Sequence, residues 1–358
     1  MAVVHQILPN LEYGDAISNY AILLRRILSS LGHDSLIFAR FVHPKLRSHA
    51  ESLSAIHRRG GDPDAIWIYH YSAASELTRT VRDLAGRLLL IYHNVTPPAL
   101  TAETDARLAA QSFAALEDLK SLADLPRLAV GDSEFNRAQL VELGFRKTDV
   151  LPLTLDFASF DKPPRRGVVK KYRDGAVNFL TVSRISPHKK IEDVIKVFRH
   201  YHEYINPRSR LFVVGDPKGT ERYQEQLLQF CRLVNLPNVL FTGKVRFREL
   251  LGHYRIADVY LCMSEHEGFC LPLLESMYLG VPVIAYKCAA VAETMGDAGV
   301  LVRQKRFDEV AEMAHLLVSD EDLRTRVIGK QKERAREFGE DRFVERLKAI
   351  LDRVQTND

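Results

Sequence analysis

Short apolar runs alternate with amphipathic stretches from one end of the 358-residue chain to the other. This alternation constrains the fold more strongly than any other feature of the sequence. Runs such as Val3–Leu8 have the length and composition of buried strands. Residues 16–31 instead repeat apolar side chains on one helical face, and Gly32 follows where a left-handed residue commonly ends a helix. Continuous apolar strands separated by helices are typical of a parallel sheet that helices cover on both faces. We therefore predict a doubly wound α/β fold.

The alternating pattern begins again near Asn178, which predicts two domains. A chain of 358 residues suits two α/β domains better than one. The prolines Pro163 and Pro164, flanked by charged residues, separate the halves. Two doubly wound sheets that face each other across a cleft bind ligands at the carboxyl ends of their strands. The expected strands are 3–8, 34–39, 65–70, 88–93, 127–131, 178–182, 211–215, 239–241, 259–262 and 282–286.

Composition and charge exclude several classes of protein. The content of 46% hydrophobic and 27% charged residues is that of a globular protein, and no apolar run approaches the ~20 residues that a membrane-spanning helix needs. The first residues lack the basic segment of a secretory signal, so we expect a cytoplasmic protein. The densest basic stretch, Lys162–Arg173, carries six positive charges and no acid. A solvated linker is the favoured interpretation, and contact with the inner face of an anionic membrane or with a phosphorylated acceptor is the alternative.

The four cysteines all lie in the second half of the chain and contain no CxxC pair. A metal site usually needs such close spacing with histidines nearby, and structural disulfides are typical of small secreted domains. The sequence therefore predicts buried, reduced thiols at Cys231, Cys262, Cys270 and Cys288.

The strongest functional signal is the segment Ser264–Pro282, which follows an expected strand, turns through Gly268 and enters a helix. A loop that leads into a helix N-terminus brings free backbone N–H groups together and binds anions readily. Glu267 lies on the loop, and Glu275 lies eight residues later inside the helix. Two carboxylates so placed suit the hydroxyl groups of one elongated ligand that has a diphosphate in its middle. The alternative is two surface acids that flank an ordinary loop.

This segment resembles the EX7E signature of the retaining GT-B glycosyltransferases of family 4, with Cys270 in place of a usual glycine and Ser276 in place of a usual alanine. The resemblance implies that Glu267 contacts the donor sugar and Glu275 the ribose of the nucleotide. It also implies that the nucleotide sugar lies against the loop and the first residue of the helix. The loop residues concerned are Gly268, Phe269, Cys270 and Leu271.

The segment Ser183–Lys190, again directly after an expected strand, resembles the family's GRLxxxKG motif. The resemblance implies that Arg184 and Lys189 grip the diphosphate and stabilise the charge that develops on it as the sugar leaves, without a metal. Ser183, in place of a glycine, is included in the expected donor site. Lys190 stands in place of the second glycine, and we favour a solvent-exposed side chain over an extra phosphate contact.

The turn around Gly14 and Asp15 after the first strand resembles the family's glycine loop over the phosphate and the acceptor, although only one glycine is present. Asp15 is an equally good N-cap for the helix that follows. The dinucleotide fingerprint GxGxxG does not occur in the required context. We predict Gly14 as a donor contact and Asp15 as an acceptor-side residue.

His93 ends an expected strand of the first half, where many family members carry a histidine that contacts the donor sugar. We therefore predict His93 as a catalytic residue. A core or capping histidine is the alternative, and His70 at the end of the preceding strand is its rival. Asn94 and Ser133, which also follow strands, are the other acceptor-side candidates.

The resemblance implies a GT-B fold: an acceptor-binding Rossmann-like domain over 1–160, a linker over 161–175, a nucleotide-sugar-binding Rossmann-like domain over 176–337, and a final helix over 338–358 that returns to the first domain. The implied activity is retaining transfer of a hexose from a UDP- or GDP-sugar to a hydroxyl of a glycan or lipid-linked acceptor, as in polysaccharide or glycolipid synthesis. A glycosyl phosphorylase, a sugar-nucleotide epimerase and a non-catalytic sugar-nucleotide-binding protein are the alternatives. We expect no nucleic-acid partner.

The sequence Asp62-Pro63-Asp64 has the form of the DxD metal motif of GT-A enzymes. It precedes a strand instead of ending one, so a turn is the better interpretation. We therefore expect no cofactor and no essential metal.

Overall fold

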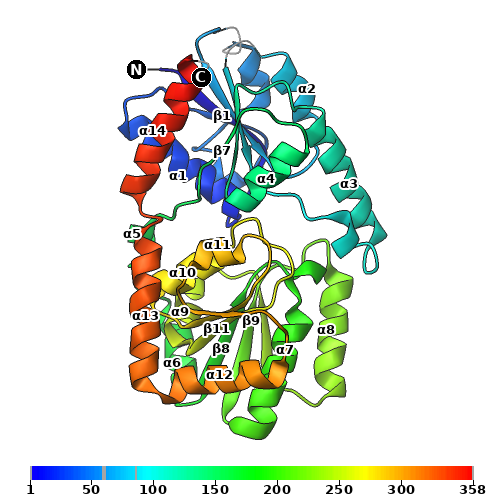
Figure 1. The fold of residues 1–358 in the computed structure, drawn as a ribbon, viewed down its shortest axis with the longest axis vertical. Helices are drawn as coiled ribbons and strands as arrows, with labels where there is room; N and C mark the ends of the chain where they lie inside the picture. The colour runs from blue at the N-terminus through cyan, green and yellow to red at the C-terminus, as the bar shows by residue number, and fades with distance from the viewer. Residues whose placement is uncertain (1, 59–61, 85–86, 357–358) are drawn as a thin grey trace. The chain divides into compact units, whose positions relative to one another are not determined.

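The computed structural model describes residues 2–58, 62–84 and 87–356. The chain divides into two compact units, coloured by residue number in Figure 1. Unit 1 comprises Met1–Asp156 together with Phe338–Asp358, and unit 2 comprises Phe157–Glu337. Among the helices of the described ranges, none combines the length and the apolar content that crossing a bilayer requires.

Unit 1 is built on a seven-stranded sheet of order β3-β2-β1-β4-β5-β6-β7, and its strand pairs are parallel. The winding direction reverses between β1 and β4, which is where open α/β sheets bind ligands at the carboxyl ends of the strands. The strands are β1 (Val4–Leu11), β2 (Ile37–Val42), β3 (Glu51–Ser52), β4 (Ile66–Tyr71), β5 (Arg87–Tyr92), β6 (Leu128–Gly131) and β7 (Thr148–Val150).

Helices cover both faces of this sheet. On one face, apolar side chains of β4 and β5 such as Trp67, Tyr71 and Leu90 pack with residues of α2, α3 and α4. The last helix, α14, belongs to the same unit, and its Phe343 meets Tyr20 of α1 with ring centroids 6.0 Å apart. The helices are α1 (Ala16–Ser30), η1 (Pro44–Leu46), η2 (Leu53–Arg58), α2 (Leu77–Arg82), η3 (Pro98–Leu100), α3 (Ala106–Lys120), α4 (Glu134–Glu142) and α14 (Glu340–Thr356).

Unit 2 is built on a six-stranded sheet of order β10-β9-β8-β11-β12-β13, again with parallel strand pairs. Here the winding direction reverses between β8 and β11, so the loops after these two strands form the expected ligand position of this unit. The strands are β8 (Val177–Val182), β9 (Ser209–Val214), β10 (Val239–Gly243), β11 (Val259–Cys262), β12 (Val283–Tyr286) and β13 (Val300–Val302).

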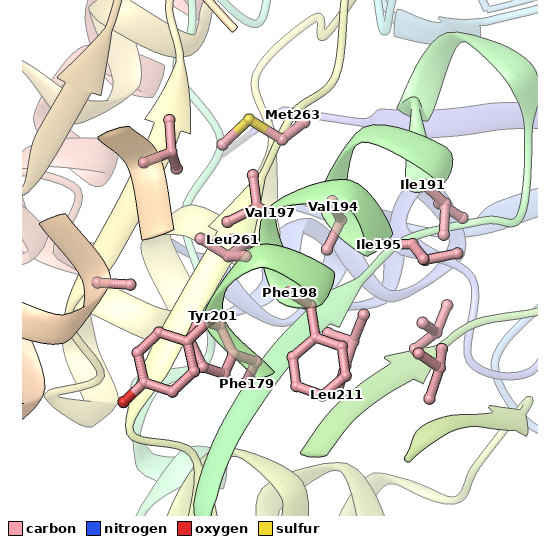
Figure 2. Close-up of a cluster of buried hydrophobic side chains, with 14 of the residues drawn as sticks. Phe179, Ile191, Val194, Ile195, Val197, Phe198, Tyr201, Leu211, Leu261 and Met263 are labelled. Atoms are coloured by element: carbon pink, nitrogen blue, oxygen red, sulfur yellow. The ribbon is translucent and has the colours of Figure 1, made fainter. Parts of the chain in front are cut away.

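Alternate residues of each strand in unit 2 face opposite layers of helices. Phe179, Leu211 and Leu261 point toward α7, where they pack with Val194 and Phe198 (Figure 2). The other face carries α9 and α10, which pack on α6 and α13. The helices are α5 (Phe157–Phe160), α6 (Arg166–Tyr172), η4 (Pro187–Lys189), α7 (Ile191–His200), η5 (Tyr201–Ile205), α8 (Glu221–Leu233), α9 (Phe247–Ile256), α10 (Leu271–Leu279), α11 (Val291–Met295), α12 (Phe307–Ser319) and α13 (Glu321–Arg336).

The segment 161–175, expected to be a linker, is instead part of unit 2 and contains helix α6. The reason is close packing of α6 on α9, where a Cβ atom at Gly252 would lie only 2.9 Å from Cβ of Val168. The six basic side chains of Lys162–Arg173 are all exposed around this helix. The segment is therefore solvated, as predicted, but it is helical and packed.

Candidate functional site

The loop between β11 and α10 positions Glu267. The turn before α11 fixes the loop, because the N–H of Ala290 donates to the carbonyl of Glu267 at 3.1 Å. The loop ends at Cys270, which is left-handed (φ 73°) and is the N-cap of α10. Phe269 and Cys270 are buried, whereas Gly268 and Leu271 are half-buried at the start of the helix. The four predicted donor residues of this loop thus lie at the amino end of α10, where backbone N–H groups favour an anion.

Lys189 and Glu267 form the centre of the candidate site. Nζ of Lys189, at the end of η4 after β8, lies 2.7 Å from Oε2 of Glu267. The two loops are also joined through their backbones, because the N–H of Glu265 donates to the carbonyl of His188 at 2.8 Å. Burial lowers the pKa of Lys189, but the charge and hydrogen bond of Glu267, together with the neighbouring Cys270 and Cys262, outweigh this effect and the pKa is raised. The half-buried ammonium is therefore held in its charged form.

Glu275 lies on α10, in contact with Tyr254 of α9. The Tyr254 hydroxyl donates to Oε2 of Glu275 at 2.6 Å. Burial raises the pKa of Glu275 to about 7, and the hydrogen bond from Tyr254 opposes that shift. Sequence reasoning missed Tyr254, because a tyrosine inside an amphipathic helix is usually a core residue.

Arg184 is exposed at the end of β8, and Ser183 beside it is half-buried. The segment after β8 runs close beside Gly215, where an added Cβ would lie 1.7 Å from the Ser183 carbonyl oxygen. A glycine is therefore required at position 215 instead of at position 183. Lys190, which we predict from the sequence to be solvent-exposed, is instead paired with two carboxylates. Its ammonium lies 3.4 Å from Glu265 and 3.8 Å from Glu192.

Two thiols border the Glu267 carboxylate. Cys262 ends β11 on the face toward α10, and one ligand atom from each of Cys262, Glu267 and Cys270 lies within 4.8 Å of the others. A hydrogen bond between the thiols lowers the pKa of Cys262 and raises that of Cys270. All four cysteines are free, and Cys231, Cys262 and Cys270 are buried as predicted, whereas Cys288 is half-buried.

In unit 1, His93 and its rival His70 are neighbours in one buried polar chain under α1. Nδ1 of His93 lies 2.9 Å from Oδ2 of Asp132, and its Nε2 lies 2.8 Å from Nδ1 of His70. Nε2 of His70 in turn lies 2.9 Å from Oε1 of Gln6, whose amide nitrogen donates to the Ala21 carbonyl. The His93 side chain is 2% exposed, so both ring nitrogens are held inside the unit.

The direction of the hydrogen bonds in this chain follows from the Ala21 carbonyl, which can only accept. It orients the Gln6 amide so that Oε1 faces His70, which must then donate from Nε2. Nδ1 of His70 is left as an acceptor for a proton on Nε2 of His93. Burial lowers the pKa of His70, in agreement with a neutral ring. Asp132 is a residue that sequence reasoning missed, although it follows β6 beside the predicted Ser133.

The other predictions in unit 1 have local structural roles. Gly14 is left-handed (φ 72°) in the turn after β1, and Asp15 caps α1, accepting from the Ser18 N–H at 2.9 Å. Ser133 caps α4 in the same way. The Asn94 amide donates to Asn136 at 2.8 Å and to Gln139 at 2.9 Å. The acceptor-side roles of Asp15, Asn94 and Ser133 stay predictions.

The Asp62-Pro63-Asp64 segment forms a turn, as predicted. The N–H of Asp64 donates to Oδ1 of Asp62 at 2.9 Å, before β4 begins. These carboxylates therefore lie at the amino end of a strand, away from the carboxyl ends where ligands bind.

Residues 169–334 match the model of the family described as "Glycosyl transferases group 1". The trehalose synthase of Pyrococcus horikoshii is 29% identical over 214 residues, which cover 58% of this chain and 48% of that protein. The chain spans about half the length of the curated relatives it matches.

Two solved structures share the fold over almost the whole chain. The sucrose-phosphate synthase of Thermosynechococcus elongatus has a TM-score of 0.79 at 17% identity and covers 100% of both chains. The Anabaena protein Alr3699/HepE, crystallised with UDP-glucose, has a TM-score of 0.76 at 16% identity and covers 98% of this chain and 100% of its own. The predicted fold class, two Rossmann-like doubly wound domains of the GT-B type, is thereby confirmed. The segment 169–334, which holds the Lys189–Glu267 pair and Glu275, is the part of the chain that matches the model of the group 1 glycosyl transferases.

Proposed function

We propose that this chain is a glycosyltransferase that moves a hexose from a nucleoside-diphosphate sugar, with UDP or GDP as the nucleotide, to a hydroxyl acceptor. The observation that supports this most directly is the Lys189–Glu267 pair, which lies in the loops after β8 and β11 where the winding of the sheet reverses, with Glu275 on the helix that follows the second loop. One half-buried cation and two carboxylates match the diphosphate and the two diol-bearing sugars of such a donor. The family match covers this part of the chain.

Donor binding would give Lys189 and Glu267 new hydrogen-bond partners. Lys189 would turn from Glu267 to the diphosphate, joined by the exposed Arg184 and the amino end of α10. Glu267 would then accept hydrogen bonds from hydroxyl groups of the hexose, and Glu275 from the ribose. The ion pair thus keeps both charges in place before the donor arrives.

The transfer would retain the anomeric configuration through attack on the face from which the diphosphate leaves. The acceptor oxygen forms the new bond to the anomeric carbon as the bond to the phosphate oxygen breaks. The acceptor proton passes to that phosphate oxygen, and Lys189 and Arg184 stabilise the charge that remains on the diphosphate. No step requires a metal ion.

The first experiment is thermal stabilisation by UDP, GDP, ADP and dTDP, each with EDTA, for the unchanged chain, Glu275→Gln and the exposed-site control Glu225→Gln. A nucleotide at about 100 times its dissociation constant adds ~2.7 kcal/mol, which raises Tm by several degrees. We expect one nucleotide to stabilise the unchanged chain and Glu225→Gln but not Glu275→Gln. Absence of stabilisation by all four would reject the proposal.

The acceptor is proposed to be a glycan or lipid-linked intermediate of polysaccharide or glycolipid synthesis at an anionic membrane. The support is the exposed basic face of α6 and its flanks, which includes Lys170 and Lys171. Each basic residue near an anionic surface contributes about 1 kcal/mol of binding. Sedimentation with anionic and with neutral vesicles at low salt tests this, and equal recovery in both pellets would contradict it.

A further inference from the structure

Three potential metal ligands meet in unit 2, although their spacing along the sequence is not one that suggests a metal site. Cys262 comes from the end of β11, Cys270 from the N-cap of α10, and Glu267 from the loop between them. Their Sγ, Sγ and carboxylate atoms lie within 4.8 Å of one another, and all three residues are buried. This is the one such group found among the described residues. Two sulfur ligands and one carboxylate oxygen are a donor set that Zn²⁺ binds in tetrahedral geometry, with water in the fourth place.

The backbone of Cys270 adopts a conformation that is strained for a residue with a Cβ atom. Its φ of 73° and ψ of 67° lie in the left-handed region, which costs a residue with a Cβ atom about 1 kcal/mol and costs glycine almost nothing. Strained positions of this kind persist where the surrounding structure holds them, and they cluster at active sites and ligand-binding sites. Here the side chain contributes a buried sulfur next to a second sulfur and a carboxylate.

The Lys189 ammonium balances the charge of the proposed metal site. Two thiolates and one carboxylate carry three negative charges, and a divalent cation with the Lys189 ammonium supplies three positive charges. Lys189 already holds Oε2 of Glu267 at 2.7 Å, in the manner of an outer group that orients a ligating carboxylate. Metal binding would release the two thiol protons to solvent.

We propose that Cys262, Cys270 and Glu267 bind one thiophilic divalent cation, of which Zn²⁺ is the type. The bound ion fixes the Glu267 carboxylate on the metal. If the proposed glycosyl transfer is correct, Glu267 and Lys189 are then withheld from the donor, and the ion acts as an inhibitor. The binding itself does not depend on that function.

The test is titration of the full reduced chain with Cd²⁺, without nucleotide, followed by its thiolate-to-metal absorption in the ultraviolet and by competition with Zn²⁺. We expect one Cd²⁺ per chain, with Zn²⁺ displacing it. Cys262→Ser and Cys270→Gly should each weaken binding at least about tenfold. Glu267→Gln should keep the thiolate absorption and weaken binding by about tenfold.

Two variants distinguish the loss of a metal ligand from unfolding as the cause of weaker Cd²⁺ binding. Cys270→Gly relieves the left-handed strain, so it folds and its loss of Cd²⁺ cannot be attributed to unfolding. Cys231→Ala, a buried thiol of α8 outside this cluster, is the matched control and should bind Cd²⁺ as the unchanged chain does. Unchanged affinity in Cys262→Ser and Cys270→Gly, or loss in Cys231→Ala alone, overturns the proposal.

The proposed inhibition of donor binding by the ion is tested in a separate measurement. Thermal stabilisation by the preferred nucleotide is measured with EDTA and with a saturating amount of Zn²⁺, for the unchanged chain and for Cys262→Ser, because Cys262 is not among the predicted donor contacts. We expect Zn²⁺ to remove the stabilisation in the unchanged chain and not in Cys262→Ser. Equal stabilisation with Zn²⁺ and with EDTA rejects the inhibition. Failure of every nucleotide in EDTA would instead reject the proposed function and leave the Cd²⁺ result standing.

Discussion

Lys189 and Glu267 are 78 residues apart in the sequence, yet their side chains meet at 2.7 Å in the loops after β8 and β11. The Lys189 side chain is 16% exposed and that of Glu267 is 8% exposed, so neither charge is well solvated. Each charge therefore depends on the other until a ligand replaces it, and this dependence can be measured.

Lys189→Met should destabilise unit 2 more than the double variant Lys189→Met/Glu267→Leu does. The single change leaves the Glu267 charge buried without its partner, which typically costs about 3 kcal/mol, whereas the double change removes both charges. Urea unfolding of the two variants and of Glu267→Leu completes the cycle. Additive changes in the free energy of unfolding would mean that the two side chains do not stabilise each other.

The raised pKa of Glu275 makes stability depend on pH in a defined direction. Burial raises the pKa from an ordinary 4.5 to about 7 in the folded state, so the folded chain binds the proton more tightly than the unfolded chain. This contribution to stability is present below about pH 4.5 and is lost as pH rises toward about 7, with a total of about 3 kcal/mol. The free energy of unfolding relative to Glu275→Gln, measured from pH 5 to pH 8, should fall accordingly.

Tyr254→Phe tests the hydrogen bond to Glu275. The Tyr254 hydroxyl opposes the effect of burial, so its removal raises the pKa of Glu275 further and extends the loss of stability to higher pH. Tyr223→Phe, which removes a hydroxyl that donates to Glu192 elsewhere in unit 2, is the control and should leave the curve in place. A Tyr254→Phe curve that matches the unchanged chain would contradict this assignment.

His93→Phe should make the stability of unit 1 fall as pH rises. Burial raises the pKa of Asp132, and the charge and hydrogen bond of His93 oppose this shift. Without His93 the pKa rises further, and above it the carboxylate is ionised, buried and unpaired at a cost of about 3 kcal/mol. Urea unfolding at pH 5 and pH 8 should show a larger loss at pH 8. The double variant His93→Phe/Asp132→Asn should lose this pH dependence.

Histidine nitrogen-15 NMR can read the hydrogen-bond direction in the same chain of side chains. His70 should be neutral at pH 7 with its proton on Nε2, because Oε1 of Gln6 accepts from that nitrogen. A proton on Nδ1 of His70 would reverse the order that the Ala21 carbonyl imposes. Gln6→Leu should remove the preference for the Nε2 proton.

Arg184→Gln should weaken nucleoside-diphosphate binding roughly tenfold or more, because a hydrogen bond to a charged group contributes about 1.5–3 kcal/mol. Lys190→Gln is the matched control in the same loop, since the Lys190 ammonium is paired with Glu265 and Glu192. Calorimetric titration with the nucleotide that stabilises the chain gives both dissociation constants. Equal weakening by the two substitutions would assign Lys190 to the phosphate as well.

The helix and strand order was largely predictable because it depends on local pattern. The apolar run at 88–93 became β5 over Arg87–Tyr92, and the amphipathic repeat at 16–31 became α1 over Ala16–Ser30, with left-handed Gly32 after it. The boundary of β2 was less accurate: the strand begins at Ile37 instead of Asp34 and continues to Val42. The helix in the expected linker was missed because its packing partner, α9, is about 80 residues away along the chain.

The sequence by itself determined the strand–helix periodicity, the loop that leads into α10 and the spacing of Glu267 and Glu275, since each depends on residues near one another along the chain. Only the tertiary structure decided which distant groups share a site. It paired Lys189 with Glu267, placed Tyr254 on Glu275, joined His70 and His93 to Asp132, and brought Cys262 beside Cys270. The physical reason is that parallel strands distant in sequence end at one edge of a sheet, so their loops meet in a way that no local pattern records.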